Sequence, residues 1–426
     1  IMKILNSKTK NFDRNLDYLL FKRRKSIKSD KVSVSNIIND VKKNGDTALI
    51  KYEKKFNRNS TIIPSAKKIT KLIKSLNPKV KKAIDTAYNR IYKFHSLQKF
   101  KNISYIDKFK NKLEYRYLPL ESVAIYVPGS LVSYPSSVLM NAIPATVAGV
   151  KRIVMINPGF KGNQNPAVLY AARKCKIKEI YSIGGPSAIA AACYGTKKIK
   201  KVDKIVGPGN AYVATAKKKL FGLVGIDMIA GPSEILIIAD KKNNPEHIAI
   251  DLLSQAEHDK LAQSILITDD ESFAKKVIQN IETFLKKIDR KDIASASWNN
   301  YGVVIISKNI QSSISLANQI APEHLELAID NSTKYLNKIK NAGAVFLGKY
   351  TPEAIGDYVA GPNHVLPTDR TAKFSSGLNV LDFFKRTSIV SCNSKNLKKI
   401  GKDAIILANQ EGLQAHALSI ECRMKN

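Results

Sequence analysis

The chain has 426 residues, enough for about two to four domains, and its hydrophobic content of 44% is ordinary for a globular protein. Its 70 Lys and Arg residues against 35 Asp and Glu residues give a formal net charge of +35. This charge is typical of a nucleic-acid-binding protein, but also of a lysine-rich solvated surface. The lysines are scattered, and the clusters 197–201 and 217–219 lack interleaved aromatic residues that would stack on bases. We therefore favour the surface interpretation, and expect no specific nucleic-acid partner.

The cysteines and the apolar segments exclude two further classes of protein. The four cysteines form no C-x-x-C pair, which is typical of a reducing compartment rather than of a disulfide-stapled secreted domain. Residues 1–25 carry charges throughout and lack the apolar centre of a signal peptide. The most apolar stretch, 132–150, is interrupted by Pro135 and Pro144, so it is no membrane span. We expect a cytoplasmic protein that does not contact a membrane.

The first 115 residues are predicted to be mainly helical and poor in chemistry. Segments 32–56 and 65–100 carry apolar residues at helical spacing with lysines between them. His95 lies in the second segment, and we interpret it as incidental to function.

From Glu121 onward, short apolar runs alternate with helix-like stretches, and several runs end in glycine. The runs are 123–127, 152–156, 179–183 and 204–206, and the helices are 136–148, 165–175, 188–194 and 211–223. This alternation predicts a parallel sheet covered on both faces, with glycines at the edge where such sheets bind ligands. A G-x-G-x-x-G motif with a downstream acid is absent, so any nucleotide site here differs from the standard one.

A second alternation follows, and it ends in a tail. Its strands are 264–267, 303–306 and 344–347, its helices are 271–287 and a segment from residue 310, and the tail is helical over 403–420. The predicted fold class is α/β: two Rossmann-like parallel-sheet domains with a helical N-terminal region and a small C-terminal tail domain. We expect an N-terminal helical extension over 1–25 and a tail domain over 378–426. The first α/β domain would combine 26–125 with 235–377 and carry the metal and acid/base residues, and the second, 126–234, would bind NAD.

Between the two alternations lies a helix with possible metal ligands. Asn244, Pro245 and Glu246 form a helix start with a cap, a proline in the first turn and an acid at the positive end. Gln255 and His258 are three residues apart, so a helix places them on one face. This pair alone is more often found on a surface or in a satisfied core.

Four of the six histidines lie in polar clusters in the second half of the chain. Asp357 and His364 lie in a Gly- and Pro-rich segment, 356–367, that is predicted to be a loop. Together with His416, the residues Gln255, His258 and Asp357 would offer two nitrogen and two oxygen ligands. Such a thiolate-free set suits a catalytic zinc site. The adjacent Glu323 and His324 offer two proton acceptors. The residues alone leave a catalytic metal site and an ordinary polar cluster equally open.

Six segments resemble the histidinol dehydrogenase family, in the order that the family has them. They are the stretch 206–240, which contains GPGNAYVATAKKKLFGLVGIDMIAGPSEILIIAD, then SQAEHD at 254–259, APEHLEL at 321–327, GDYVAGPNHVLPT at 356–368, FSSGLNVLDFFKR at 374–386 and EGLQAHA at 411–417. The likeness runs from about residue 30 to the C-terminus. It implies an enzyme that oxidises L-histidinol to L-histidine in two NAD-dependent steps, the last steps of histidine biosynthesis, with one zinc ion per subunit.

The resemblance also implies roles for individual residues. The zinc ligands would be Gln255, His258, Asp357 and His416, the last reaching across a homodimer with exchanged tails. His324 would take the hydroxyl proton during hydride transfer, and Glu323 would activate the water that adds to the aldehyde. The substrate would also contact the residues Ser233, His364 and Glu411, and NAD would contact the residues Tyr126 and Asn210.

Two departures from the family pattern fall on the NAD side. The family usually has Pro-Gly-Gly where this chain has Pro128-Gly129-Ser130, and a glutamine that contacts the cofactor where this chain has Ser187. These departures put the affinity for the cofactor in question rather than the reaction. One alternative is an NAD dehydrogenase of the same fold that acts on another small alcohol; Glu411 and His416, which serve the imidazole-bearing substrate, argue against it. The other is a basic nucleic-acid-binding protein on an enzyme fold.

Overall fold

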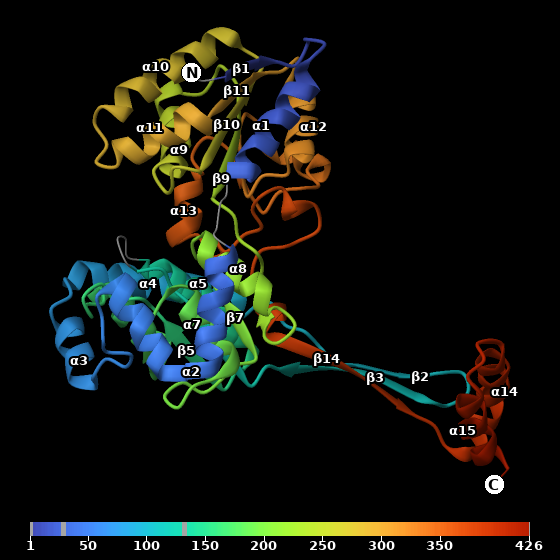
Figure 1. The fold of residues 1–426 in the computed structure, drawn as a ribbon. Coiled ribbons are helices and arrows are strands. Elements are labelled where there is room, and N and C mark those ends of the chain that lie inside the picture. Colours follow the sequence, from blue (N-terminus) through green and yellow to red (C-terminus); the bar gives the residue numbers. More distant parts are fainter. Residues whose placement is uncertain (1–2, 27–30, 130–133, 426) are drawn as a thin grey trace.

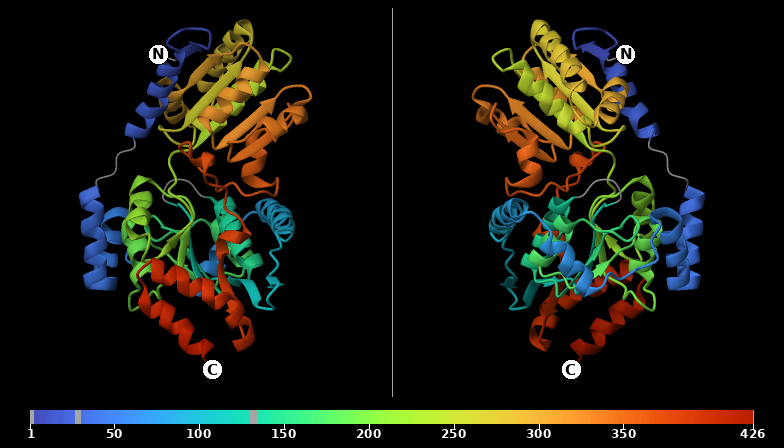
Figure 2. Two further views of the ribbon diagram at one scale, coloured as in Figure 1. Left: turned by 90° about the vertical axis from the view of Figure 1, so that its right-hand side faces the viewer. Right: turned by 90° about the vertical axis from the view of Figure 1, so that its left-hand side faces the viewer.

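The computed structural model describes residues 3–26, 31–129 and 134–425. Figure 1 shows two parallel-sheet units stacked one above the other, with an arm that projects from the lower unit. Figure 2 shows from two further sides that the N-terminal residues belong to the upper unit, while the C-terminus lies at the opposite end of the molecule. The predicted α/β class with two parallel sheets is confirmed. The segment 356–367, which was predicted to be a loop, is helical over residues 356–358.

The upper unit contains a six-stranded sheet in the order β1-β11-β10-β9-β12-β13, with all neighbours parallel. Its strands are β1 (Lys3–Asn6), β9 (Glu234–Ala239), β10 (Gln263–Thr268), β11 (Val303–Ile306), β12 (His324–Ala328) and β13 (Ala344–Leu347). Every residue of β9, β10 and β12 is buried, as expected for central parallel strands with helices on both faces.

Helices cover both faces of this sheet. On one face lie α1 (Phe12–Ser26) and α12 (Ile310–Ile320), and on the other α9 (Pro245–Ala256), α10 (Glu271–Leu285) and α11 (Lys291–Tyr301). After β12 the chain forms a short 3-10 helix, η1 (Ser332–Lys338), and after β13 it forms the helix α13 (Glu353–Tyr358). As predicted, α9 begins at Pro245 with the Asn244 side chain accepting a hydrogen bond from the backbone N–H of Glu246.

The lower unit contains a five-stranded parallel sheet in the order β6-β5-β4-β7-β8. Its strands are β4 (Ser122–Tyr126), β5 (Arg152–Ile156), β6 (Glu179–Tyr181), β7 (Lys204–Val206) and β8 (Gly225–Ile226). When the strands of each sheet are numbered along the chain, β4–β8 and β9–β13 both follow the spatial order 3-2-1-4-5. The upper sheet therefore repeats the topology of the lower one, with β1 added at its edge.

Seven helices among the described residues pack on the lower sheet. One face carries α3 (Ala66–Lys74), α4 (Pro78–His95), α5 (Pro135–Ala148) and α6 (Pro166–Lys174), and the other carries α2 (Lys31–Asn57), α7 (Gly185–Tyr194) and α8 (Ala211–Leu220). The interface between α2 and α7 is made by apolar residues such as Val34, Ile38 and Leu49 against a run of alanines. This apolar interface holds α2 on the lower unit.

This packing differs from the predicted division of the chain. Residues 26–125 were expected to join the metal-bearing unit, whereas helices α2–α4 pack on the five-stranded sheet. Residues 3–25, expected as a separate extension, supply β1 and α1 to the six-stranded unit. Charged helices with narrow apolar stripes carry no local signal for which of two sheets they cover, so contacts distant in sequence decide it.

The arm is an antiparallel sheet that ends in a helix pair. Its strands, in the order β14-β3-β2, are β14 (Phe384–Ser391), β3 (Lys112–Pro119) and β2 (Ile103–Ile106). Beyond them, α14 (Ser394–Gln410) and α15 (Gln414–Met424) pack against each other, away from both parallel sheets (Figure 1). Two short 3-10 helices, η2 (Thr371–Lys373) and η3 (Val380–Phe383), precede the arm. Ile406 and Leu407 are 66% and 63% exposed within this chain.

One predicted loop contains a helix. The segment 356–367 was expected to be irregular throughout, but α13 extends to Tyr358. Gly356 lies inside this helix. A Cβ atom at that position would come within 2.5 Å of the Phe346 ring, so the glycine lets the helix pack closely on β13. Glycine was therefore a sign of close packing here, not of a loop.

None of the helices in the described part of the chain is long and apolar enough to cross a membrane.

Candidate active site

Two acid/base candidates lie at the amino-terminal edge of the six-stranded sheet. Glu323 directly precedes β12, and His324 is its first residue. The neighbouring strand β9 begins at Glu234, whose backbone carbonyl lies 2.9 Å from His324 Nδ1. The backbone N–H of Glu234 donates to Glu323 Oε2 at 2.9 Å. The two side chains are therefore fixed by one residue of the adjacent strand.

This geometry sets the protonation of the His324 ring. A backbone carbonyl can only accept a hydrogen bond, so Nδ1 carries the hydrogen and Nε2 keeps its lone pair. Nε2 lies 3.5 Å from Glu353 Oε1 and has no hydrogen-bond partner among the described residues. His324 is thus oriented as a base with its accepting nitrogen free.

Burial shifts the pKa of both residues of the pair. It lowers the pKa of His324, although the nearby Asp357 opposes the shift, so the imidazole stays neutral near pH 7 and can accept a proton. Burial and the charge of Glu234 raise the pKa of Glu323 well above its usual range.

Glu234 is itself held by α1. Its carboxylate forms a buried ion pair with the Arg23 guanidinium and accepts a hydrogen bond from the backbone N–H of Asp369 at 2.9 Å. Arg23 Nε also donates to the carbonyl of Leu261 at 2.9 Å. The N-terminal helix therefore stabilises the strand end that positions the acid/base pair, a role that the sequence did not reveal.

The short helix α13 adds two carboxylates on one face. Glu353 and Asp357 are four residues apart. Asp357 Oδ1 lies 3.5 Å from His364 Nδ1. Ligand atoms of His324, Glu353 and Asp357 lie within 4.8 Å of one another, close enough to hold a metal ion. Sequence analysis missed Glu353; its signal was the spacing to Asp357 directly after Pro352.

Neighbouring histidines lower the pKa of Asp357. Burial alone would raise the pKa of its carboxyl group, but the hydrogen bond with His364 and the nearby His324 and His258 imidazoles outweigh burial and lower it. Asp357 is therefore ionised at neutral pH, as a metal-binding carboxylate must be. The interaction also places His258 within electrostatic range of the cluster.

Gln255 is a buried side chain whose two polar atoms both lack a hydrogen-bond partner among the described residues. It is fully buried in the last turn of α9, and both Oε1 and Nε2 lack a hydrogen bond within the described part of the chain. Helix α9 packs on α13, and Ser254 Oγ donates to Glu353 Oε2 across that interface at 3.4 Å. A buried, unpartnered amide is costly unless a ligand or metal satisfies it.

The buried nitrogen and oxygen atoms around α13 and the start of β12 thus fit a metal ion. His364 Nε2, His324 Nε2 and Glu353 Oε1 are also buried without partners among residues 3–26, 31–129 and 134–425. Nitrogen and oxygen donors that converge on one region suit zinc in a catalytic rather than a structural site.

The loop after α13 connects this edge to the lower unit. Asn363 Nδ2 donates to the carbonyl of Met140 on α5 at 2.6 Å, and Arg90 of α4 donates to the carbonyl of Ala360 at 3.3 Å. His95 is fully buried, 3.4 Å from Asn363 through its Nε2 atom, so its role is to pack beneath this loop. The candidate site therefore faces the five-stranded unit, with α13 on the side between the two units in Figure 1.

Of the residues predicted to contact the substrate or the metal, Ser233 and His364 lie near this cluster, whereas Glu411 and His416 do not. Ser233 directly precedes β9, and its carbonyl accepts from the backbone N–H of Gln263 at 3.0 Å. His364 contacts Asp357, as described above. Glu411 and His416 lie on the arm, at the end of α14 and in α15, and both are exposed. Within one chain they are not brought to the cluster (Figure 1).

The predicted NAD contacts lie at the carboxyl-terminal edge of the five-stranded sheet. Tyr126 ends β4, and its buried hydroxyl accepts a hydrogen bond from the backbone N–H of Gly185 at 3.2 Å. Burial raises the pKa of Tyr126 to about 12. Asn210 caps α8 and accepts from the N–H groups of Tyr212 and Val213, both at 3.1 Å.

Two further features define this second edge. Gly207 has φ of +107°, and a Cβ atom there would lie 2.3 Å from the Tyr126 carbonyl, so only glycine allows the loop to pass so close. Glu53 of α2 is buried and accepts from the backbone N–H of Gly184 at 2.8 Å; burial raises its pKa to about 7. Sequence analysis missed Glu53.

The two departures from the family pattern have different outcomes. Ser187 is buried in the first turn of α7, where its hydroxyl donates to the Gly184 carbonyl at 3.0 Å. Ser130 lies outside the described residues. The effect of either residue on NAD binding stays a prediction.

Comparisons with known proteins give one consistent result. A sequence model of the family described as histidinol dehydrogenase matches residues 21–424. A histidinol dehydrogenase of Pelagibacter ubique is 63% identical over all of both chains, and histidinol dehydrogenase 1 of a Nostoc species is 51% identical over all of this chain and 99% of its own. The crystal structure of histidinol dehydrogenase from Elizabethkingia anophelis superposes with a TM-score of 0.91 at 37% identity, covering 100% of this chain and 98% of that one.

Proposed function

The chain belongs to the histidinol dehydrogenase family, and we propose that it oxidises L-histidinol to L-histidine through the aldehyde, with two NAD and a zinc ion. The observation that carries this proposal is His324, a buried and neutral imidazole whose Nε2 atom points without a partner into a cluster of carboxylates and histidines. The product places the reaction at the end of histidine biosynthesis.

The substrate would lie at the amino edge of the six-stranded sheet. Gln255, His258 and Asp357 of one subunit, with His416 of a second copy, are the proposed zinc ligands. Zinc bound there would supply a positive charge that attracts the imidazole and amine of the substrate. Ser233, His364 and Glu411 of a second copy would complete the polar contacts, and a substrate held in this way would keep its intermediate in place between the two steps.

The first step removes a proton and a hydride from the alcohol. His324 Nε2 would take the hydroxyl proton as the carbon-bound hydrogen leaves with its electron pair and a carbonyl forms. NAD, when bound, would supply the acceptor for that hydride. The hydrogen bond from Nδ1 to the Glu234 carbonyl keeps the ring in the required tautomer throughout.

The second step adds water and removes another hydride. Glu323 would take a proton from water as the water oxygen attacks the aldehyde carbon. His324 would then accept a proton from the hydrate as the second hydride leaves, with a second NAD as its acceptor when bound. One histidinol, one water and two NAD then give histidine, two NADH and three protons. The hydrogen bond from the Glu234 N–H to Glu323 Oε2 supports this role, because it holds the carboxyl group in a fixed position beside His324.

A comparison of substrates tests the proposal. NADH formation should depend on L-histidinol, disappear on chelation and return with zinc, while L-leucinol, which has the amino alcohol but no imidazole, should give at least about 100-fold less. Equal rates with leucinol would instead favour an enzyme of the same fold for another small alcohol.

We also propose that the active form is a homodimer with exchanged tails. Four observations support it: the arm projects away from both sheets, its helices expose apolar side chains, it carries Glu411 and His416, and the cluster at the amino edge lacks partners for several buried atoms. A second copy would bring the missing side chains to each site.

Mixed dimers test this exchange. Inactive His324→Asn and His416→Ala subunits would be unfolded and refolded together. In a mixed dimer, the subunit that keeps His324 receives an intact tail, so about a quarter of wild-type activity should return when subunits pair at random. If each tail serves its own subunit, no activity returns, while size-exclusion chromatography confirms that dimers have formed.

We propose the cytoplasm as the location. All four cysteines are free, and Cys392 and Cys422 are exposed, which suits a reducing compartment. Fractionation of cells that express the tagged protein should place it with the cytoplasmic enzymes; recovery in a membrane or extracellular fraction would contradict this.

A further inference from the structure

The repeated topology of the two sheets defines two equivalent positions. In open parallel sheets, ligands bind at the carboxyl ends of the strands, where the strand order reverses. In the five-stranded sheet this point lies between β4 and β7, which carry Tyr126 and precede Asn210. In the six-stranded sheet it lies between β9 and β12. The catalytic cluster is at the amino ends of β9 and β12, so their carboxyl ends are free for another role.

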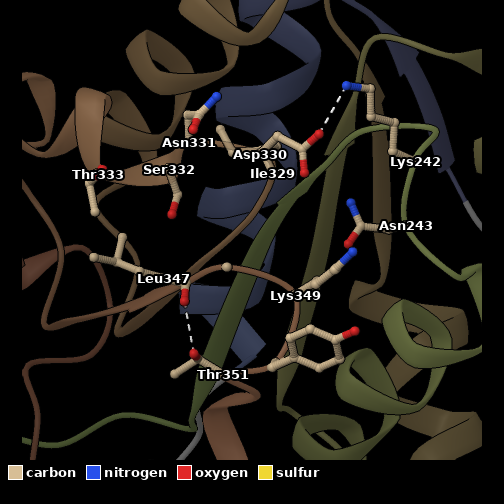
Figure 3. Close-up of a pocket in the computed structure, with 12 residues that line it drawn as sticks. Lys242, Asn243, Ile329, Asp330, Asn331, Ser332, Thr333, Leu347, Lys349 and Thr351 are labelled. Carbon is tan, nitrogen blue, oxygen red and sulfur yellow. Dashed lines mark hydrogen bonds and ion pairs between the residues drawn. The ribbon is translucent and has the colours of Figure 1, made fainter.

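A cavity of about 300 Å³ lies at this second position. Figure 3 shows that its walls come from the loops that follow β9, β12 and β13. Lys242 and Asn243 follow β9, residues 329–333 follow β12, and residues 348–351 follow β13. The cavity thus lies at the reversal of strand order.

The cavity has a cationic side and a hydroxyl-bearing side. In Figure 3, Lys242, Asn243 and Lys349 lie on one side, and Asn331, Ser332 and Thr333 on the other. Lys242 Nζ pairs with Asp330 Oδ2 at 2.9 Å, but the two side chains are 69% and 55% exposed, so the pair is weak and Lys242 can turn toward an anion at little cost.

An aromatic ring stands at the rim of the cavity. Tyr350 is 82% exposed, and Lys349 Nζ lies 5.4 Å from the centre of its ring. An exposed ring beside a lysine can stack on a base while the lysine contacts a phosphate. A volume near 300 Å³ is at the lower end for small-molecule sites, which suits one nucleotide rather than a dinucleotide.

We propose that this cavity is a second ligand site, separate from the catalytic cluster, that binds a nucleoside monophosphate. Lys242 and Lys349 contact the phosphate, Asp330 and Ser332 contact the ribose hydroxyls, and Tyr350 stacks on the base. The proposal rests on the cavity and on the topology, not on the oxidation of histidinol.

Equilibrium dialysis of adenosine 5′-monophosphate against the full-length protein tests the site. We expect saturable binding below about 1 mM. The double variant Lys242→Ala/Lys349→Ala should weaken it at least tenfold, and Tyr350→Ala about fivefold. Lys241→Ala, an exposed lysine next to the cavity but outside its lining, is the matched control and should bind as the wild type does.

Further arms separate this site from the predicted NAD site and from simple anion binding. Asn210→Ala should leave binding of the nucleotide unchanged, and the double lysine variant should oxidise histidinol at the wild-type rate. Inorganic phosphate and adenosine should each bind at least tenfold more weakly than the monophosphate. The proposal is overturned if the nucleotide does not bind, if Asn210→Ala but not the lysine variant abolishes binding, or if phosphate alone binds as tightly.

Discussion

The six-stranded and five-stranded sheets share the strand order of β9–β13 and β4–β8, yet they present different chemistry at opposite edges. The upper sheet gathers Glu323, His324 and the carboxylates of α13 at the amino ends of its strands. The lower sheet places Tyr126 and Asn210 at the carboxyl ends of its strands. The loop after α13 bonds to α4 and α5, so the acid/base cluster faces the lower unit. One topology can therefore present different chemistry when different edges are used.

The cause of the difference lies in the residues at the strand ends. The amino edge of the upper sheet combines buried titratable side chains with backbone groups that orient them, as at Glu234. The lower sheet instead has glycine loops, and Gly207 allows a backbone approach that a side chain would block. Buried titratable side chains suit proton transfer, while a close backbone suits a phosphate-bearing group.

The largest expected effect comes from removing the proposed base. His324→Asn keeps a side-chain N–H for the Glu234 carbonyl but loses the accepting nitrogen, so turnover should fall about 1,000-fold. Steady-state NADH formation measures this, and zinc content measured by atomic absorption should stay unchanged. A variant that loses its metal would show that His324 is a ligand rather than the base.

Replacing Gln255 separates function from stability. Gln255→Met removes two buried polar atoms that have no hydrogen bond within the described residues, so the metal-free protein should gain about 1 kcal/mol in free energy of unfolding. The same change should weaken zinc binding roughly 100-fold. Urea unfolding of the chelated protein and a competitive zinc titration measure the two effects.

Gln263→Met is the matched control, because Gln263 is also buried but donates to the Tyr301 carbonyl at 3.2 Å. It should lose stability and keep its zinc. If Gln255→Met destabilises the metal-free protein as Gln263→Met does, Gln255 has a structural partner and is not poised for a metal.

Glu53 should make stability depend on pH. Its pKa is raised from 4.5 to about 7 in the folded state, so the folded chain holds a proton that the unfolded chain releases. The resulting stabilisation is complete below pH 4.5 and is lost as the pH rises to about 7. The stability of Glu53→Gln relative to wild type should therefore be about 3 kcal/mol greater at pH 8 than at pH 4.5. Parallel urea titrations that give equal differences at both values would refute a raised pKa.

The smallest expected effect tests the cofactor edge. Tyr126→Phe removes the acceptor for the Gly185 N–H and should raise the KM for NAD about fivefold, which corresponds to about 1 kcal/mol. The KM for histidinol and kcat should change less than twofold. An effect on histidinol alone would place Tyr126 on the substrate side and remove the contrast between the two edges.

Much of the architecture could be predicted from the sequence, because parallel strands buried on both faces are continuous apolar runs that local patterns reveal. Glycine after 123–127 and 204–206 also indicated where two strands of the lower sheet end. The attachment of α2–α4 could not be predicted, since it depends on apolar stripes that match a surface distant in sequence. Glycine misled at Gly356, where it serves close packing on Phe346.

The candidate site was predictable only in part, for a similar reason. Glu323 and His324 are adjacent in sequence, and their burial and their hydrogen bonds to Glu234 follow from the pairing of β9 with β12. Glu353 looked like an ordinary acid at a helix start, and its proximity to His324 emerges only when α13 packs beside β12. The arm shows the limit most clearly, because the pairing of β14 with β3 carries Glu411 and His416 away from both parallel sheets, and no local pattern predicts that pairing.

The most direct test of the account counts the NADH formed per L-histidinol at completion, with the wild-type protein and the Glu323→Gln variant side by side. The amino-edge cluster predicts two NADH per histidinol for the wild type, because one base works in both steps and Glu323 activates the water between them. Glu323→Gln should form the first NADH and stall, with its side-chain oxygen still available to the Glu234 N–H. One NADH per histidinol from the wild type, or an unchanged count of two at an unchanged rate from the variant, would contradict the account.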